Sequence, residues 1–535
     1  MVGALGDGDA DTGDVSGAGG AGGGYTGSLP PMAFNMARYV IGRAAAATPD
    51  AIALIVARDI DATDCEQWTY RALEDSMLRA GAVLRAHDLA PGDRLLIQLP
   101  NTSLYARAYF GAIAVGLIPI PASDQLTAIE RDFLLADSGA RALLTDRRDT
   151  DHPVANGITV LSPDALDGAL ARTAPASYAD TTAQTPAYLV YTSGTTSKPK
   201  GVLHAHRAAW GRRPMYEGWY GLRSDDRVLH AGAFNWTYTL GTGLTDPWAH
   251  GATALVYTGE KAPEVWPRLI KTLGASLFAT VPGLYRQILA RGAPDLTDLP
   301  TLRHGLMAGE QPPADLVATW TEMTGRPIYE ALGMSEISTY ISTSPATPPR
   351  AGMAGRAQPG RCVAILAPDS PDGDVPVPLS PGEEGLLAVH RTDPGLMLGY
   401  WNRPDADAEV RRGDWFVGGD LAVIDADGYI AHRGRADDVI KALGYRVAPM
   451  EVEAAVRAHP DVSDVACVGL PVKDGVTIVA AFVVPANPYA PPSPDALDAF
   501  ARTQLAAYKC PRQWTMIDAL PRTANGKLKR KALLS

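Results

Sequence analysis

The stretch Tyr191-Thr-Ser-Gly-Thr-Thr-Ser-Lys-Pro-Lys-Gly201 decides the fold, because it places glycine, hydroxyl and lysine residues directly after the apolar run Ala187–Val190. Such residues after a strand let successive backbone N–H groups turn toward one anion, and Lys200 adds positive charge. The stretch therefore predicts a phosphate-binding loop. Its candidate anion ligands are Thr192, Ser193, Gly194, Thr195, Thr196 and Lys200. It is not a G-x-x-x-x-G-K-[ST] loop, because Gly201 follows Lys200 and Pro199 follows Lys198.

Strand-like and helix-like segments alternate on both sides of this loop. Short apolar runs predict strands at Ala51–Val56, Arg94–Pro100, Thr253–Tyr257 and Leu277–Val281, and helical spacing of apolar residues predicts a helix over Tyr70–Arg85. This alternation is typical of an α/β architecture with mostly parallel strands. We expect a large N-terminal domain over residues 28–435, built from several subdomains.

The pattern changes near residue 435. Val452, Ala455, Val456 and His459 share one helix face, and they are followed by shorter strand-like and helix-like runs. These runs are Val465–Val468, Ala480–Val484, Leu497–Ala507 and Trp514–Ile517. We therefore expect a second, smaller and mobile α+β domain over residues 436–535.

Residues 1–27 contain eleven glycines and no lysine or arginine, which predicts a disordered tail. The N-terminal sequence has no cationic start followed by an apolar stretch, the pattern typical of a secretory signal, so we expect a cytoplasmic protein. The most apolar segment, Ala108–Pro121, is shorter than the ~20 residues of a membrane helix and predicts a buried helix followed by a strand.

The composition narrows the range of partners. The 535 residues include 48 Lys and Arg against 59 Asp and Glu, a formal net charge of −11, which disfavours broad contact with nucleic acid or anionic lipid. The four cysteines lie far apart, without a CxxC pair, and so do not indicate a disulfide framework or a zinc site. His204 and His206 have no third ligand nearby, which favours structural histidines over a metal pair.

The glycine-hydroxyl stretch resembles the T-S-G-T-T-G-x-P-K-G loop of the adenylate-forming enzymes, the superfamily of acyl-CoA synthetases, peptide-synthetase adenylation domains and firefly luciferase. It departs at Ser197, where the family usually has glycine. Serine is the smallest residue with a Cβ atom, so the loop can still close unless this position requires a positive φ.

Further blocks match the family in the expected order. Ala308-Gly-Glu310 resembles the adenine-side turn, which implies that Gly309 and Glu310 bind nucleotide. Tyr329-Glu-Ala-Leu-Gly-Met-Ser-Glu336 resembles the Y-G-x-T-E block. That likeness implies that Ser335 contacts the α-phosphate, Glu336 holds Mg²⁺ and Gly333 borders the acid.

The C-terminal part carries four more such blocks. Asp420 matches the aspartate that accepts hydrogen bonds from ribose hydroxyls, and Arg435 the arginine that contacts ribose and phosphate. The resemblance further implies a hinge at Asp437, a pantetheine tunnel at Gly444, a phosphate contact at Arg446 and a catalytic lysine at Lys527.

The acid pocket is expected between Ala233 and Trp248, where amino-acid-activating relatives carry an aspartate and this chain has Phe234-Asn235. The absence of this aspartate disfavours an α-amino acid as the substrate. The run from Tyr238 resembles benzoate-CoA ligases, and other blocks resemble medium-chain acyl-CoA synthetases. Trp236 and Tyr238 are expected to pack on a ring and Asn235 to bond a substituent, unless these aromatic residues belong only to the core.

The resemblance implies an AMP-forming acid-thiol ligase. It would use ATP, Mg²⁺ and coenzyme A to activate an aromatic, alicyclic or medium-chain carboxylate as acyl-AMP and transfer it to the thiol. One alternative is a stand-alone adenylase that loads an aryl acid onto the phosphopantetheine of an acyl carrier protein. A second alternative, suggested by Ser197 alone, is a catalytically inactive nucleotide-binding protein.

Overall fold

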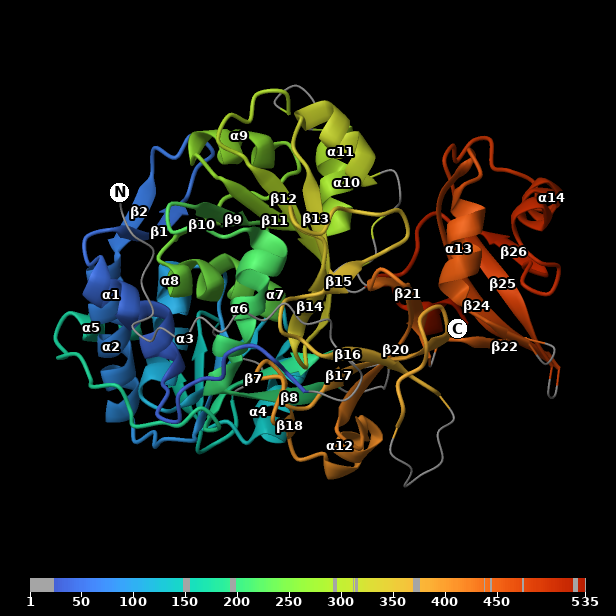
Figure 1. Cartoon of the computed structure of the whole chain (residues 1–535). Helices are drawn as coiled ribbons and strands as arrows, with labels where there is room; N and C mark the ends of the chain where they lie inside the picture. The colour runs from blue at the N-terminus through green and yellow to red at the C-terminus, as the bar shows by residue number, and fades with distance from the viewer. Residues whose placement is uncertain are drawn as a thin grey trace. The chain divides into compact units, whose positions relative to one another are not determined.

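The computed structural model describes residues 24–147, 154–192, 199–291, 296–310, 312, 316–368, 376–436, 438–442, 445–473, 476–522 and 528–534 (Figure 1). The chain divides into two compact units. The first comprises Met1–Cys362 and Val389–Phe416, and the second comprises Val363–Ala388 and Val417–Ser535. The second unit thus includes strands that precede residue 435 in the sequence. A mobile domain beginning near residue 436 remains a prediction.

A long sheet forms the centre of the first unit. Its strands run in the order β15-β14-β13-β12-β11-β9-β10-β1-β2, and β1, β10, β9, β11, β12 and β13 are parallel to one another. Their bounds are Ile52–Ala57 (β1), Cys65–Thr69 (β2), Arg227–His230 (β9), Thr253–Tyr257 (β10), Leu277–Thr280 (β11), His304–Ala308 (β12), Ile328–Met334 (β13), Ser338–Ser342 (β14) and Gly355–Ala357 (β15). The predicted α/β architecture is confirmed, with antiparallel strands only toward the ends of this series.

Three helices cover one face of this sheet (Figure 1). They are α9 (Val265–Thr272), α10 (Pro282–Arg291) and α11 (Leu316–Thr324). Each contributes one fully buried large aromatic side chain, namely Trp266, Tyr285 and Trp320. Tyr285 contacts Trp320 edge to face, with ring centroids 4.8 Å apart. Burial of such rings is among the largest apolar contributions to a core.

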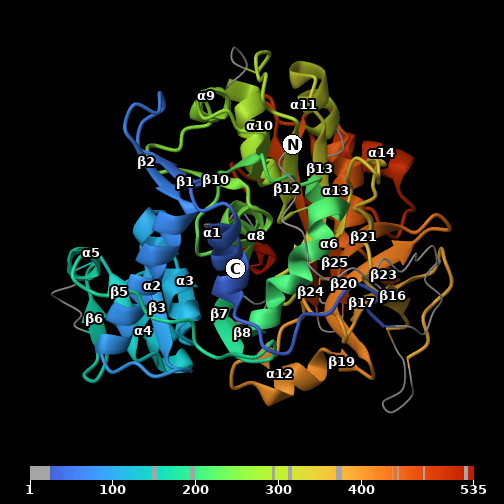
Figure 2. The same ribbon diagram turned by 60° about the vertical axis from the view of Figure 1, so that its left-hand side comes forward.

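A smaller parallel sheet, β4-β3-β5-β6, lies elsewhere in the first unit (Figure 2). Its strands are Arg94–Gln98 (β3), Ile118–Ala122 (β4), Ala142–Thr145 (β5) and Thr159–Leu161 (β6), and its helices are α2 (Tyr70–Ala86), α3 (Ser103–Ala114), α4 (Ala128–Ser138) and α5 (Pro163–Leu170). Helices α2 and α3 approach closely at Gly111, where a Cβ atom would lie 2.5 Å from the Met77 carbonyl oxygen. The predicted buried helix and strand between Ala108 and Pro121 are confirmed.

A three-stranded antiparallel sheet carries the predicted phosphate loop. Strands β7 (Pro186–Thr192) and β8 (Lys200–Ala205) form a hairpin, and β18 (Gly399–Tyr400) pairs with β8. The apolar run Ala187–Val190 therefore lies in a strand, as its composition predicts.

The second unit contains β16 (Val363–Leu366), most of β17 (Glu384–His390) and of β20 (Trp415–Ile424), and β21 (Tyr429–Arg435), followed by the hairpin of β22 (Ile440–Ala442) and β23 (Tyr445–Val447). Next come α13 (Pro449–Arg457), β24 (Val462–Lys473), β25 (Val476–Pro485), α14 (Pro494–Gln504) and β26 (Gln513–Met516). Val452 and Val456 of α13 are buried with Cys467 and Val479, which makes this α+β part a core of its own.

The described chain begins within the predicted tail. Residues 1–23 lie outside the described residues, but the backbone N–H of Tyr25 donates to Thr392 Oγ1 at 2.8 Å and that of Thr26 to the Gly360 carbonyl at 2.9 Å. Residues 24–27 are thus joined to the first unit, which the glycine-rich composition does not predict. Among the described residues, no helix has the length and apolarity needed to cross a membrane.

Candidate active site

Two paired residues flank the predicted phosphate loop in the hairpin of β7 and β8, which we call the phosphate hairpin. Thr192, the last residue of β7, pairs with Lys200, the first residue of β8. Ser193, Gly194, Thr195, Thr196 and Ser197 lie outside the described residues, so their proposed contacts with phosphate remain predictions. The Lys200 Nζ atom lies 5.4 Å from the centre of the Tyr400 ring, a cation–π contact made possible because β18 pairs with β8.

The turn between β13 and β14 carries Ser335 and Glu336. Glu336 Oε1 accepts a 2.7 Å hydrogen bond from the Tyr400 hydroxyl, and the Glu336 carbonyl accepts one of 2.8 Å from Met397 N–H. The structure therefore brings Lys200 and Glu336 to the same tyrosine. A cation and a carboxylate around one aromatic ring suit a site for a phosphate and its counter-ion.

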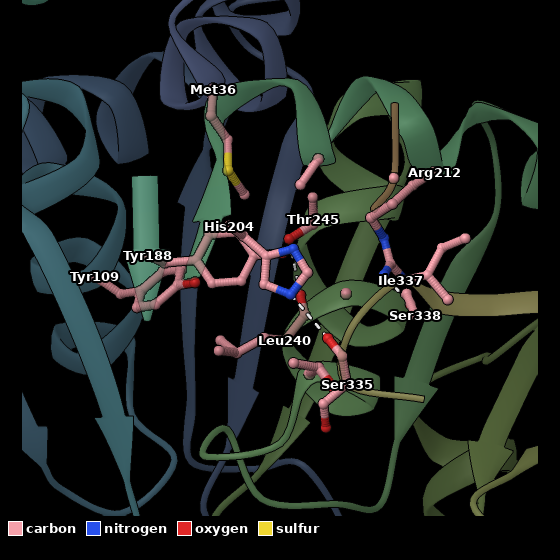
Figure 3. A pocket seen from close by; sticks show the side chains of 14 residues that line it. Met36, Tyr109, Tyr188, His204, Arg212, Leu240, Thr245, Ser335, Ile337 and Ser338 are labelled. Atoms are coloured by element: carbon pink, nitrogen blue, oxygen red, sulfur yellow. Dashed lines mark hydrogen bonds between the residues drawn. The ribbon is translucent and has the colours of Figure 1, made fainter. Parts of the chain in front are cut away.

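The buried side of this turn faces a small cavity of about 20 Å³ (Figure 3). The His204 Nε2–H group donates a 2.8 Å hydrogen bond to the Ser335 carbonyl, and the His204 ring stacks on Tyr188 with centroids 4.7 Å apart. Burial lowers the pKa of His204 to about 4, so the ring is neutral near pH 7 and Nε2 must be the donor to this carbonyl.

A buried ion pair lies beside the same cavity. Arg212 donates to both carboxylate oxygens of Asp246, at 2.7 and 2.6 Å, and its Nη1 donates to Ser338 Oγ at 2.5 Å. Burial would lower the pKa of Arg212, but the Asp246 carboxylate raises it above the ordinary value, so the guanidinium stays charged.

The carboxyl ends of β12 and β13 meet at one edge of the central sheet, where open α/β sheets bind ligands. Gly309 directly follows β12 with a φ of +105°, and a Cβ atom there would have only Val281 Cγ1 within 4 Å, at 3.5 Å. The Glu310 carboxylate lies 3.9 Å from Arg286 Nη2. This backbone turn leaves a face that a flat base can approach, which fits the nucleotide role expected for Gly309.

The predicted acid-pocket residues flank α7 (Thr237–Leu240). Asn235, Trp236 and Tyr238 are half-buried, and the Tyr238 hydroxyl donates to the carbonyl oxygens of Thr280 at 3.3 Å and Leu306 at 3.4 Å. The Tyr238 ring also stacks on Trp219, with centroids 5.9 Å apart. The Tyr238 ring also meets His230 edge to face, with centroids 4.4 Å apart, so Tyr238 packs against the core and is only partly exposed.

Gly333 is held by its surroundings. A Cβ atom at this position would lie 2.3 Å from the Ser338 carbonyl oxygen and 2.5 Å from Thr339 Cα. The two strands also shift register between Leu332 and Gly333. Only glycine permits this close approach of β13 and β14, which shapes the turn that carries Ser335 and Glu336.

The second unit holds the predicted ribose site. Asp420 Oδ1 lies 3.2 Å from His432 Nε2 and 4.0 Å from Arg435 Nη1, and Arg435 Nη1 donates to the Gly418 carbonyl at 2.7 Å. The structure therefore brings Asp420 and Arg435 together, on the paired strands β20 and β21.

Four other predicted positions are not tested by these contacts. Asp437, Gly444 and Lys527 lie outside the described residues, as does the side chain of Arg446. Arg522 and Leu528, on either side of residues 523–527, form an antiparallel bridge. The roles of all four residues remain predictions.

The donor set fits Mg²⁺ held jointly with phosphate oxygens. Within the described ranges, no three His, Cys, Asp or Glu residues gather as metal ligands, whereas Glu336 offers one oriented carboxylate. Mg²⁺ commonly binds one or two carboxylates together with substrate phosphates and water.

The structural interpretation of His204 and His206 agrees with the contacts, since His206 Nδ1 accepts a hydrogen bond from Met36 N–H at 2.9 Å.

The sequence did not indicate Tyr400 or Arg212 as residues of this site, and it indicated His204 only as a structural histidine, without its contact to Ser335. Tyr400 lies 64 residues from Glu336, and His204 lies 131 residues from Ser335. Neither pair has a local spacing that could have signalled the contact. Only the pairing of β8 with β18 and the course of the chain after β8 bring them together.

Comparisons with known proteins identify the family of this chain. Residues 41–401 match the family of AMP-binding enzymes, and residues 451–527 match the C-terminal domain of AMP-binding enzymes. The 3-hydroxybenzoate–CoA ligase of Aromatoleum sp. (strain CIB) is 31% identical over 86% of this chain and 90% of its own length. The fatty acid–[acyl-carrier-protein] ligase ScoC of Streptomyces coeruleorubidus is 31% identical over 87% and 91%.

A solved structure shares the architecture as well. The crystal structure of a benzoate CoA ligase from Burkholderia xenovorans LB400 superposes with a TM-score of 0.80 at 27% identity, covering 94% of this chain and 100% of that one. The expected superfamily and fold are confirmed. The chain belongs to the family of AMP-binding enzymes.

Proposed function

We propose that this protein is an ATP-dependent acid–CoA ligase whose substrate is an aromatic carboxylic acid of the benzoate type. The ligase class is supported by the family and by the similar 3-hydroxybenzoate–CoA and benzoate CoA ligases. The observation that carries the proposal is the junction at Tyr400, which places Lys200 and Glu336 around one ring at the turn that contains Ser335.

The reaction has two steps. A substrate carboxylate oxygen attacks the α-phosphorus of ATP, which forms the acyl-adenylate and releases pyrophosphate. A thiolate then attacks the acyl carbon, which forms the thioester and releases AMP. The first step needs no general base because the carboxylate is already the nucleophile, so positioning and charge stabilisation account for most of the acceleration.

This chain's residues divide these tasks. Lys200 would stabilise phosphate charge, Ser335 would donate to the α-phosphate, and Asp420 would accept from the ribose hydroxyls. Glu336 would hold Mg²⁺, which offsets the negative charge of the phosphates. At ~4 Å and an effective dielectric constant near 20, one pair of opposite unit charges contributes roughly 4 kcal/mol, so a few such cations can decide the rate.

The aromatic substrate class rests on the acid pocket. Tyr238 and Trp236 offer partly exposed aromatic surface, and Asn235 offers both a donor and an acceptor for a ring substituent. Between Ala233 and Trp248 the one acidic residue is Asp246, whose two carboxylate oxygens already bind Arg212 in a buried ion pair, so it is not available to pair with an α-ammonium group. These features favour a benzoate over an amino acid.

An acyl carrier protein is the second candidate acceptor, because the similar enzyme ScoC is named for that acceptor. The test measures carboxylate-dependent ATP–pyrophosphate exchange with benzoates, cyclohexane carboxylates and C4 to C10 fatty acids. Thioester formation is then measured with coenzyme A and with a phosphopantetheinylated carrier protein. The proposal fails if the fatty acids support faster ATP–pyrophosphate exchange than every benzoate, or if coenzyme A yields no thioester.

A further inference from the structure

The turn Ser335–Ser338 is held at both of its ends by side chains that lie on β8 or follow it. His204, on β8, bonds the Ser335 carbonyl at 2.8 Å. Arg212, seven residues after β8 ends, bonds Ser338 Oγ at 2.5 Å. Glu336 lies between these two anchored residues, so its backbone cannot rotate freely while both contacts persist.

The imidazole of His204 is itself fixed. Its ring is 2% exposed and stacks on Tyr188 with an interplanar angle of 15°. Because Nε2–H donates to Ser335, Nδ1 carries no proton, and Nδ1 has no hydrogen-bond partner among the described residues. Nδ1 belongs to a side chain that lines the cavity of about 20 Å³, which is large enough for one water molecule that could donate to it (Figure 3).

Arg212 is fixed by a second set of contacts. Asp246 binds its guanidinium through both carboxylate oxygens, and the Tyr220 hydroxyl donates to Asp246 Oδ2 at 2.7 Å. The remaining donor Nη1 points to Ser338, as Figure 3 shows. Ser338 has a φ of +74°, a conformation that residues with a Cβ atom rarely adopt and that persists where surrounding contacts impose it.

We propose that His204 and Arg212 are positioning residues for adenylate formation, which hold the Ser335 hydroxyl and the Glu336 carboxylate in the orientation that Mg²⁺-ATP requires. The inference rests on the proposed function, since that function assigns phosphate to Ser335 and Mg²⁺ to Glu336. His204 and Arg212 lie outside the recognised motifs, yet their contacts fix the orientation of Ser335 and Glu336. Neither His204 nor Arg212 needs to touch the nucleotide.

The first test replaces the hydrogen-bond donor and keeps the ring. His204→Phe retains an aromatic surface against Tyr188 but loses Nε2–H, whereas His204→Gln retains a neutral N–H donor near the same position. We expect His204→Phe to lower kcat of ATP–pyrophosphate exchange about tenfold and to raise the half-saturating Mg²⁺ concentration severalfold, because the loss of one oriented donor costs about that factor. The KM of the acid should stay within about twofold, and His204→Gln should recover most of the loss.

His304 provides a matched control. Its Nε2 also makes a 2.8 Å hydrogen bond to a backbone carbonyl, that of Tyr220, and its side chain is 3% exposed, but it lies at the start of β12 rather than at the turn. His304→Phe should therefore lower the melting temperature about as much as His204→Phe while leaving the Mg²⁺ dependence unchanged. Equal Mg²⁺ dependence of the two variants, or a wild-type value in His204→Phe, would overturn the proposal.

The second anchor is tested at its acceptor. Ser338→Ala removes the contact with Arg212 without leaving the buried Asp246 carboxylate unpaired, as a change of Arg212 would. We expect the same rise in half-saturating Mg²⁺ as in His204→Phe, and an unchanged value would remove Arg212 from the proposal.

Failure of the proposed function can be told apart from failure of this inference. If the wild-type protein shows no exchange with any carboxylate, the proposed function fails. Calorimetric binding of Mg²⁺-ATP then decides the inference, because His204→Phe should bind more weakly than His304→Phe. Equal binding by these two variants would contradict the positioning role in that case.

Discussion

The hydroxyl of Tyr400 donates a 2.7 Å hydrogen bond to Oε1 of Glu336, although the two residues are 64 positions apart in the chain. The ring of the same tyrosine lies 5.4 Å from Lys200 Nζ. The Tyr400 side chain therefore contacts both Lys200, the cation that follows the phosphate loop, and Glu336, the carboxylate expected to hold Mg²⁺. The relative placement of these charges depends on β18, which supplies Tyr400 and pairs with β8.

The substitution Tyr400→Phe should weaken the response to Mg²⁺. It removes the donor to Glu336 and keeps the ring beside Lys200, so the carboxylate loses its orientation while the cation–π contact remains. Loss of a hydrogen bond to a metal-binding side chain typically costs 10- to 100-fold in metal affinity or activity. We expect the half-saturating Mg²⁺ concentration for pyrophosphate exchange to rise about tenfold.

Tyr178→Phe is the control for that experiment. The Tyr178 hydroxyl also donates to a glutamate oxygen at 2.7 Å, but its partner is Glu74 on α2. This variant should retain the wild-type Mg²⁺ titration. A similar titration for Tyr400→Phe would mean that the phenol does not orient Glu336.

Asp420→Asn should raise the KM of ATP. The ribose hydroxyls would lose a charged acceptor, and a hydrogen bond to a charged group contributes roughly 1.5–3 kcal/mol, which corresponds to about 10- to 100-fold. Steady-state kinetics at saturating acid would measure the change. Asp427→Asn makes the same change of charge at an exposed position just before β21 and should leave the KM of ATP unaltered. Equal KM values for both variants would argue against a ribose contact.

The order of strands and helices was predictable because each has a simple local pattern. Thr253–Tyr257 is a continuous apolar run and forms β10 over the same residues, and Tyr70–Arg85 has helical spacing and forms α2. The glycine-hydroxyl stretch follows a strand, as its motif requires. The predicted pair Asp420 and Arg435 lies on paired strands for the same reason, since both belong to a local hairpin.

Long-range contacts were not predictable in this way. Tyr400, His204 and Arg212 reach the candidate site through strand pairing and buried packing that leave no spacing rule in the sequence. The positive φ of Ser338 was not predictable either, because serine rarely adopts this conformation and no local motif marks it. A short motif identifies residues that contact the ligand more readily than it identifies the residues that position those ligand contacts.

Lys527→Ala should separate the two half-reactions. The family resemblance assigns this lysine to adenylate formation alone, and removal of one preorganised donor commonly slows a reaction by roughly 10²–10³. We expect that loss in carboxylate-dependent pyrophosphate exchange, with thioester formation from supplied acyl-adenylate nearly unchanged. Lys529→Ala, two residues later and exposed, should affect neither step. An equal loss of both half-reactions in Lys527→Ala would refute the assignment.

The carboxyl of Glu330 on β13 should make stability depend on pH. Burial raises the pKa of Glu330 from 4.5 to about 7. The folded state therefore favours the protonated carboxyl, so its contribution to stability is complete below about pH 4.5 and is lost as the pH rises through about 7. Glu330→Gln stays neutral throughout and should not show this loss.

The comparison requires unfolding at several pH values. A pKa difference of that size corresponds to at most ~3 kcal/mol, so Glu330→Gln should gain stability relative to the wild type between pH 5 and pH 8, up to that limit. Thermal unfolding by calorimetry at pH 5, 6, 7 and 8 would measure the change. Glu322→Gln, at an exposed position on α11, should follow the wild-type curve. If Glu330→Gln also follows it, the carboxyl ionises without cost in the folded protein and burial does not govern its titration.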